Sequence, residues 1–284
     1  MNPILVIGAT GTVGRQVVAQ LIADGSPVRA MARNPDRAKL PPQVQMVPGD
    51  LTVPETLDGC LAGTEAVFLV WTAPPSAVSP ALERITRRAR RIVYLSAPLK
   101  TPHPLFQQPN LLRPMFEQIE HTVRTSGVPW TFLRPGMFAA NALLWWAPQI
   151  RTGDVVRWPY LSVPTAPIDE RDIAAVAVRA LREQGHTGAE YVLTGPQSLT
   201  HSEQISTIAN VLGRDLRVEE ITPDQARREL LTIGPLPAVN MLLDAWSAAL
   251  GHAAHITSTF TQITGAPAKS FRTWATDNAA AFRT

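Results

Sequence analysis

A glycine-rich loop directly after the first apolar run constrains this chain more than any other sequence feature. The run Ile4–Ile7 leads into Gly8-Ala9-Thr10-Gly11-Thr12-Val13-Gly14, and apolar residues at helical spacing follow at once. Glycines at these places allow a sharp turn, a close approach of the backbone to a pyrophosphate and tight packing of helix on strand. The pattern predicts a dinucleotide site with contacts from Gly8, Thr10, Gly11, Thr12, Val13 and Gly14. The alternative is an ordinary tight turn between a strand and a helix.

Short apolar runs alternate with helical patterns through the first half of the chain. Strands are predicted at residues 4–7, 28–31, 44–47, 66–70, 92–95 and 130–133. This alternation is typical of a parallel sheet with helices on both faces. We therefore predict a Rossmann-type, doubly wound α/β fold. Its nucleotide-binding domain covers residues 1–155, with residues 165–195 returning to it, and residues 196–284 form a smaller, mostly helical substrate-binding lobe.

The end of the second predicted strand indicates which dinucleotide binds. NAD sites usually place Asp or Glu there, about 20 residues past the glycines, to hold the ribose hydroxyls. This chain has Arg33 at that point, followed by Arg37 and Lys39. A guanidinium suits a 2′-phosphate through charge-assisted hydrogen bonds. The sequence predicts NADPH as the cofactor, contacted by Arg33 and Lys39, with NADH as the alternative. If Arg33 is only a solvated loop residue, it gives no preference for NADPH over NADH.

Further motifs resemble one family. They are Gly49-Asp50-Leu51, then Ser126-Gly127 with Pro129-Trp130-Thr131 and Arg134-Pro135-Gly136, then Ile168-Asp169-Glu170-Arg171-Asp172. With the glycine loop and Arg33, they resemble the NmrA-like atypical short-chain dehydrogenase/reductases over nearly the whole chain. The resemblance implies that Asp50 and Leu51 lie against the adenine, Val70 along the ribose and Pro135 beside the nicotinamide. It does not fix a reaction, because the family includes quinone reductases, aromatic-ketone reductases and redox-sensing regulators without catalysis.

The acid pair of the superfamily is missing from this chain. Dehydrogenases of this kind usually deliver a proton from Tyr-x-x-x-Lys, in which lysine lowers the pKa of the tyrosine. The matching positions here hold Leu112 and Phe116, neither of which donates a proton. Ser96, after the fifth predicted strand, matches the superfamily's substrate-orienting serine, and a strand-end cap is the alternative. His103, between two prolines, is a candidate proton source, although such a histidine is more often simply exposed.

Aromatic side chains after the fourth and sixth predicted strands favour a large, flat substrate. The candidate substrate contacts are Trp71, Met115, Phe116, Met137, Phe138, Trp145 and Trp146. Packing between lobes is the alternative for each of them. We therefore predict an NAD(P)H-dependent ketoreductase acting on a carbonyl of a polycyclic aromatic polyketide of the angucyclinone type, in antibiotic biosynthesis, with the substrate's own hydroxyl assisting. The alternatives are an NADPH quinone oxidoreductase and a non-catalytic NADP(H)-sensing regulator.

Composition excludes several other classes of protein. The formal charge of +3 is too small to indicate a nucleic-acid partner, although the arginines at 84, 87, 88, 90 and 91 keep that alternative open. The single cysteine, Cys60, and the absence of zinc-like spacing predict no structural disulfide and no metal. No apolar run is long enough for a membrane span, and the start lacks the basic residues of a signal peptide. We expect a cytoplasmic protein of undetermined oligomeric state.

Overall fold

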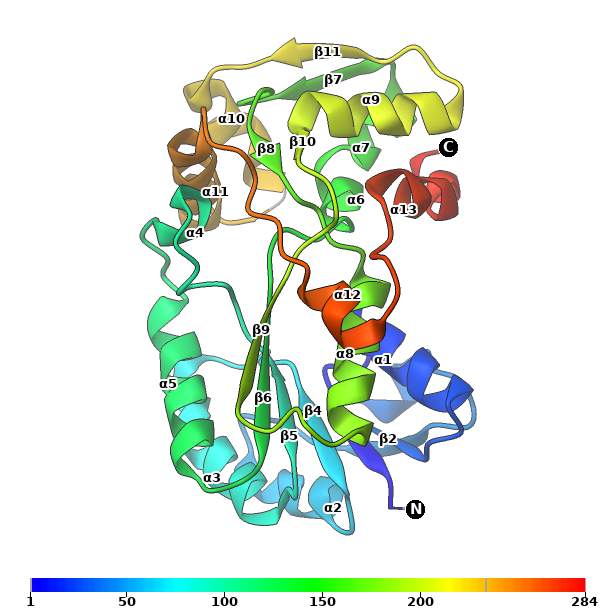
Figure 1. The fold of residues 1–284 in the computed structure, drawn as a ribbon, viewed down its shortest axis with the longest axis vertical. Helices are drawn as coiled ribbons and strands as arrows, with labels where there is room; N and C mark the ends of the chain where they lie inside the picture. Colours follow the sequence, from blue (N-terminus) through cyan, green and yellow to red (C-terminus); the bar gives the residue numbers. More distant parts are fainter. Residues whose placement is uncertain (1, 233, 284) are drawn as a thin grey trace. The chain divides into compact units, whose positions relative to one another are not determined.

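A seven-stranded sheet organises the first of the two units into which the chain divides. The structure is a computed structural model that describes residues 2–232 and 234–283. Unit 1 comprises Met1–Ala97, Leu111–Pro135 and Glu170–Val192, and unit 2 comprises Pro98–Asn110, Gly136–Asp169 and Leu193–Thr284. The strand order in unit 1 is β3-β2-β1-β4-β5-β6-β9 (Figure 1). The order reverses between β1 and β4, as in Rossmann folds, which confirms the predicted fold class.

The strands of this sheet are short, and those in its middle are buried on both faces. Their bounds are β1 Ile4–Ile7, β2 Val28–Ala32, β3 Gln45–Pro48, β4 Ala66–Leu69, β5 Ile92–Leu95, β6 Trp130–Pro135 and β9 Ala189–Leu193. The first six pair in parallel, with Ile4 in register with Val28 on one side and Ala66 on the other. Burial on both faces explains why β1 and β4 are uniformly apolar instead of alternating.

Helices cover both faces of this sheet. α1 and α8 pack on one another on one face, whereas α2, α3 and α5 cover the opposite face (Figure 1). In α3, the buried Val78, Ala81, Leu82 and Ile85 recur three and four residues apart, which gives the helix its apolar stripe. The helices of unit 1 are α1 Thr12–Ala23, α2 Leu57–Leu61, α3 Val78–Arg88, α5 Arg113–Thr125 and α8 Glu170–Arg182, with 3₁₀ turns at Pro35–Arg37, Pro54–Thr56 and Pro75–Ala77.

Unit 2 is built from helices with two small strand pairs. β7 and β11 pair in parallel, and β8 and β10 pair antiparallel. The capping boxes of Thr200 with Glu203 and of Thr222 with Gln225 start α9 and α10, as the sequence predicts. Its strands and helices are α4 Pro104–Gln107, α6 Asn141–Trp145, α7 Ala147–Thr152, β7 Val155–Trp158, β8 Pro164–Thr165, β10 Leu199–Thr200, α9 His201–Leu212, β11 Arg217–Glu220, α10 Pro223–Glu229, α11 Leu236–Ala249, α12 Thr259–Thr264 and α13 Phe271–Asp277, with 3₁₀ turns at Leu230–Thr232 and Ala279–Phe282.

The boundaries of the units differ from the predicted domains. Residues 170–192 belong to unit 1, whereas residues 165–169 and 193–195 at the two ends of the predicted return cluster with unit 2. Residues 98–110 and 136–155, however, cluster with unit 2 and not with the predicted domain 1–155. The physical reason is the apolar side of α6 and α7, whose Ala142, Trp145 and Ile150 are buried in the core of unit 2. No helix among the described residues is both long and apolar enough to cross a membrane.

His201 lies at the centre of the core of unit 2. Its side chain is fully buried, and four tryptophan rings surround it at centroid distances of 5.0 to 6.3 Å: Trp145, Trp146, Trp158 and Trp246. Its Nδ1 lies 3.1 Å from the carbonyl oxygen of Tyr160, so the neutral ring carries its proton on Nδ1. Tyr160 has a φ of 52°, a left-handed conformation that this hydrogen bond helps to hold. Burial lowers the pKa of His201 to about 4, because the surrounding rings do not solvate an imidazolium.

We expect the fold to lose stability as the pH falls from about 6.5 towards 4. In that window the unfolded chain protonates His201, whereas the folded chain keeps it neutral, so the unfolded state binds more protons. The loss is on the order of 3 kcal/mol at its limit. Urea unfolding of the wild type and of His201→Gln between pH 7.5 and 5 measures it. The variant should show a flatter dependence on pH, and the exposed-site variant His121→Gln should retain the wild-type slope; equal slopes for all three would contradict the assignment.

Candidate functional site

The glycine loop turns the chain from β1 into α1 and has no room for side chains at two of its positions. Gly8 has a φ of +84°, and a Cβ atom there would lie 2.7 Å from Cβ of Val70. A Cβ atom on Gly14 would collide with the carbonyl group of Gly8. No side chain caps the start of α1, because its N-cap residue is Gly11. The first N–H groups of α1 therefore stay available for a pyrophosphate.

A cavity of about 650 Å³ opens in unit 1 at the carboxyl ends of β1 to β4. Open α/β sheets bind ligands at this place, where the strand order reverses. Of the predicted cofactor contacts, these line the cavity: Gly8, Thr10, Gly11, Arg33, Lys39, Asp50, Leu51 and Val70. Thr12, Val13 and Gly14 lie in the first turn of α1 and Pro135 ends β6, outside the lining. The lining also includes Arg15, Thr52 and Thr72, which the sequence analysis missed because they have no fixed place in the glycine motif.

Four positively charged side chains line this cavity. Arg15, Arg33, Arg37 and Lys39 all line it and are all exposed. Arg15 donates through Nη2 to the carbonyl oxygen of Thr10, 2.7 Å away. The other three follow the end of β2, where NAD sites usually carry a carboxylate. This charge fits the 2′-phosphate of NADPH.

Asp50, which follows β3, lines the same cavity and is held in place by hydrogen bonds. One oxygen, Oδ1, accepts hydrogen bonds of 2.8 Å from both N–H and Oγ1 of Thr52, and the N–H of Asp50 donates to Oγ1 of Thr56. The hydrogen bonds from Thr52, followed by the charge of Arg33, keep the pKa of Asp50 below its ordinary value. Asp50 is therefore a fixed, ionised acceptor, suited to an N–H or O–H group of the cofactor.

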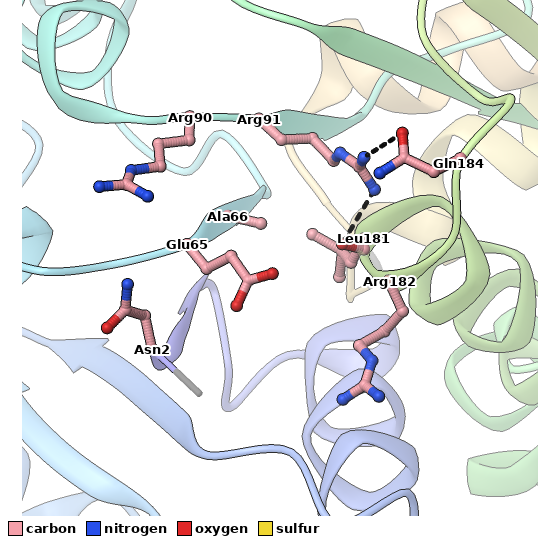
Figure 2. Close-up of a pocket in the computed structure, with 8 residues that line it drawn as sticks. All are labelled: Asn2, Glu65, Ala66, Arg90, Arg91, Leu181, Arg182 and Gln184. Carbon is pink, nitrogen blue, oxygen red and sulfur yellow. Dashed lines mark hydrogen bonds between the residues drawn. The ribbon is translucent and has the colours of Figure 1, made fainter.

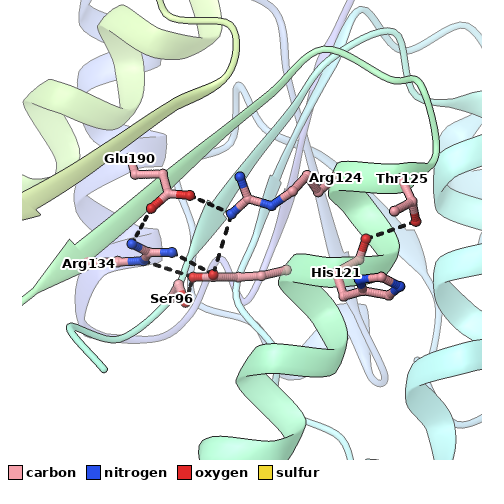
Figure 3. Close-up of polar contacts among 7 residues, drawn as sticks. Ser96, His121, Arg124, Thr125, Arg134 and Glu190 are labelled. Atoms are coloured by element: carbon pink, nitrogen blue, oxygen red, sulfur yellow. Dashed lines mark hydrogen bonds and ion pairs between the residues drawn. The ribbon is translucent and has the colours of Figure 1, made fainter. Parts of the chain in front are cut away.

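A charge network that is buried at Glu120 and Arg134 connects α5 with β5, β6 and β9 (Figure 3). Arg134 donates through Nε to Oε1 of Glu120 at 2.9 Å and through Nη2 to Oε2 at 2.6 Å. Arg134 and Arg124 each bind Glu190 as well. The guanidinium of Arg124 also lies 4.5 Å from the ring centroid of Trp130. Two carboxylates and two guanidinium groups thus neutralise one another, which burial of Glu120 and Arg134 requires.

Ser96 donates a hydrogen bond to this network. Its hydroxyl is buried and donates to Oε1 of Glu120 at 2.7 Å (Figure 3). Because the proton is directed at Glu120, the free lone pairs of Ser96 accept hydrogen bonds but cannot protonate a substrate. The predicted substrate-orienting role remains a prediction, limited by this geometry to a group that donates to Ser96.

The other candidates for proton donation are engaged or buried too. Tyr94 lies between Phe116 and Phe132, and its hydroxyl has no hydrogen-bond partner among the described residues. Burial raises the pKa of Tyr94, and the charge of Glu120 raises it further. His103 is the N-cap residue of α4. Its Nδ1 accepts from the N–H of Leu105 at 3.2 Å, and its Nε2 lies 2.9 Å from the carbonyl oxygen of Ala253. Both ring nitrogens are therefore in use within unit 2, which leaves no free proton for a substrate.

The predicted substrate contacts divide between the two units. Trp71 and Met115 are buried in the core of unit 1, Phe116 packs against them, and Nε1 of Trp71 donates to the carbonyl oxygen of Ala73. Trp145 and Trp146 are buried in the core of unit 2, at 8% and 0% exposure, because they pack around His201. Their burial favours the packing alternative over the predicted substrate contacts. Met137 and Phe138 are half-buried in unit 2. Among the described residues, no group of three or more His, Cys, Asp or Glu is placed to hold a metal ion.

We expect Arg33→Ala to weaken NADPH binding and leave NADH binding unchanged. The substitution removes a charge-assisted contact to the 2′-phosphate, a loss of roughly tenfold or more in affinity. Fluorescence titration with both nucleotides measures it, and the exposed Arg87→Ala variant on α3 serves as the control. Unchanged NADPH affinity would refute the assignment of Arg33.

We expect Tyr94→Phe to raise the free energy of unfolding by about 1 kcal/mol, because it removes a buried hydroxyl without a partner. Tyr191→Phe is the matched control, since the Tyr191 hydroxyl lies 2.9 Å from Nδ1 of His186 and its loss should destabilise the fold. Urea unfolding measures both variants. A loss of stability in Tyr94→Phe would show that the hydroxyl has a partner.

Comparison with known proteins shows the family to which the chain belongs. Residues 8–184 match the model of a family described as NAD(P)H-binding. Over 98% of its length the chain is 41% identical to a (4-alkanoyl-5-oxo-2,5-dihydrofuran-3-yl)methyl phosphate reductase of Streptomyces griseus, covering 99% of that protein. It is 33% identical to an NAD(P)H azoreductase of Xenophilus azovorans, over 98% of this chain and 99% of that one. The crystal structure of an Escherichia coli NADPH-dependent quinone oxidoreductase with NADPH superposes with a TM-score of 0.81 at 23% identity, covering 96% of this chain and 99% of that one. The chain belongs to the NAD(P)H-binding family.

Proposed function

We propose that the protein is an NADPH-dependent oxidoreductase whose substrate is a conjugated acceptor that needs no protein acid. One observation carries this proposal: the two catalytic candidates, Ser96 and His103, and the buried Tyr94 are not free to donate a proton. Ser96 gives its proton to Glu120, both nitrogens of His103 are hydrogen-bonded, and Tyr94 is buried. When bound, NADPH supplies the hydride. The chain binds and orients the two partners, and positioning alone lowers a barrier by several kcal/mol.

The absence of a Tyr-x-x-x-Lys pair limits which substrates the protein can reduce. Hydride addition to an isolated ketone produces an alkoxide, a strong base that must be protonated or stabilised as it forms. Hydride addition to a carbon–carbon double bond conjugated with carbonyl groups produces a delocalised enolate. A quinone likewise yields a phenolate. These anions take a proton from water after the hydride has moved, so they do not require a tyrosine–lysine pair.

The relatives act on acceptors of this kind, as their names describe. The substrate of the Streptomyces griseus relative is a dihydrofuranone with an alkanoyl group and a ring carbonyl on one alkene carbon. Hydride added to the other alkene carbon gives an enolate shared by both carbonyl groups. At 41% identity over almost the whole of both chains, that compound class is the best candidate for this protein. The azo and quinone acceptors of two other relatives are also conjugated.

A hydroxylated polycyclic ketone remains the second candidate. A phenol beside its carbonyl would supply the proton internally, which again needs no protein acid. The narrower prediction, that the chain is the angucyclinone ketoreductase of simocyclinone biosynthesis, rests on the sequence resemblance, the missing acid pair and the aromatic side chains. Because Trp145 and Trp146 are buried in the core of unit 2, they give little support for a large, flat substrate.

We expect NADPH to be oxidised with an alkanoyl-dihydrofuranone methyl phosphate and with a benzoquinone, and not with an unconjugated ketone such as cyclohexanone. NADPH absorbance follows the reaction. Deuterated NADPH should place the label on the alkene carbon that does not carry the alkanoyl group. A hydroxylated tetracyclic ketone, assayed in parallel, tests the second candidate.

Two variants check that no side chain supplies the proton. Ser96→Ala and His103→Gln should change kcat by less than about threefold, because neither residue has a free proton in the fold. A loss of 10²-fold or more in either variant, or efficient reduction of cyclohexanone, would contradict the proposal. Tight NADPH binding without oxidation by any of these acceptors would favour the non-catalytic sensor.

A further inference from the structure

The arginine-rich run at residues 84–91 is only partly explained by internal contacts. Arg84 pairs with Asp58 at 2.5 Å, Arg88 pairs with the same carboxylate at 3.1 Å, and Arg87 pairs with Glu83 at 2.6 Å. These pairs turn most of the run into a neutralised helix surface. Arg90 is different, because it is exposed and has no recorded hydrogen bond or ion pair among the described residues.

Arg90 lines a cavity of about 550 Å³ in unit 1 (Figure 2). The cavity lies where β4 and β5 begin and where α8 ends, so it opens at the amino ends of the strands. The cofactor cavity lies at their carboxyl ends, and the two share no lining residue. The lining is almost entirely polar: Asn2, Glu65, Ala66, Arg90, Arg91, Leu181, Arg182 and Gln184.

Two further arginines of this lining are fixed by contacts that hold them in position. Arg91 donates through Nη1 to the carbonyl oxygens of Ala180, Leu181 and Glu183, and so caps the carboxyl end of α8. Arg182 binds Ser26 and lies 3.3 Å from Asp24, both through Nη1. The recorded contacts of Arg182 leave its Nη2 and Nε free for a ligand.

We propose that this cavity binds a small phosphate-bearing anion, with Arg90 and Arg182 as its ligands. Three guanidinium groups and one carboxylate, Glu65, line the cavity, and Asp24 beside Arg182 offsets one further charge, which leaves a positive balance. Guanidinium groups match the oxygen geometry of phosphate. No aromatic ring lines the cavity, which offers a nucleotide base nothing to stack on and favours a small hydrophilic ligand.

Glu65 adds a selective element to this site. It points into the cavity between the arginines in Figure 2, and no ion pair within 4.0 Å is recorded for it. A carboxylate there repels an inorganic phosphate but accepts a hydrogen bond from a hydroxyl group beside a phosphate ester. The side-chain amide of Asn2 lies next to it as a second polar group. The site should therefore prefer a hydroxylated phosphate monoester over inorganic phosphate.

Thermal unfolding of the full chain tests whether this cavity binds a phosphate-bearing anion. The measurement uses saturating NADPH, which fills the cofactor cavity, and constant ionic strength. Inorganic phosphate and glycerol 3-phosphate are the probes. Both should raise Tm in a saturable way, glycerol 3-phosphate at lower concentration. Arg90→Ala should weaken both by about tenfold, because it removes a charge-assisted contact without breaking an internal one. Arg87→Ala, three residues away on the same run, should bind both normally.

A second substitution separates this site from non-specific charge effects. Glu65→Gln should strengthen binding of inorganic phosphate and reduce the preference for glycerol 3-phosphate, whereas Glu83→Gln on α3 should change neither. No saturable shift, an equal shift in Arg90→Ala and wild type, or a shift lost only in Arg33→Ala would each overturn the proposal. The last result would place the anion in the cofactor cavity.

Discussion

The close approach of α1 to β1 and β4 is the constraint on which the nucleotide site depends. Gly8 lies against Val70, and Gly14 lies against the carbonyl group of Gly8, at distances that no side chain permits. This contact brings the start of α1 to the point where the strand order reverses. The ends of β2 and β3 then add Arg33 and Asp50 to the same cavity. The packing of these two glycines thus positions both the predicted phosphate cradle and Arg33, which is predicted to select the dinucleotide.

The network of Glu120 and Arg134 limits what Ser96 can do at the carboxyl ends of β5 and β6. A buried carboxylate needs a partner, and Arg134 supplies two hydrogen bonds to it. Ser96 supplies a third, which commits its proton. The hydrogen bonds that compensate for the burial of these charges also engage the proton of Ser96, so Ser96 cannot act as an acid. A fold of this kind suits acceptors whose own conjugation stabilises the charge that hydride transfer creates.

Basic side chains line cavities at both the carboxyl ends and the amino ends of the strands in unit 1. At the carboxyl edge, Arg33 and Lys39 face the cofactor cavity. At the amino edge, Arg90 and Arg182 face a second, polar cavity, while the arginines between them on α3 pair with Asp58 and Glu83. A net charge of +3 conceals this arrangement, because it sums paired and unpaired groups alike. Among the described residues, Arg33, Lys39 and Arg90 have no ion pair, whereas Arg182 lies 3.3 Å from Asp24.

The sequence by itself determined the fold class, the strand positions, the helix caps at Thr200 and Thr222 and eight of the residues that line the cavity at the carboxyl ends of β1 to β4. These features depend on local patterns: apolar runs, capping boxes and glycines at a strand end. Only the tertiary structure decided that Trp146 is buried around His201, that residues 136–155 join unit 2, and that Ser96 and His103 have no free proton. Each of these depends on contacts between residues far apart in the chain, such as Ser96 with Glu120, and local patterns carry no information about such pairs.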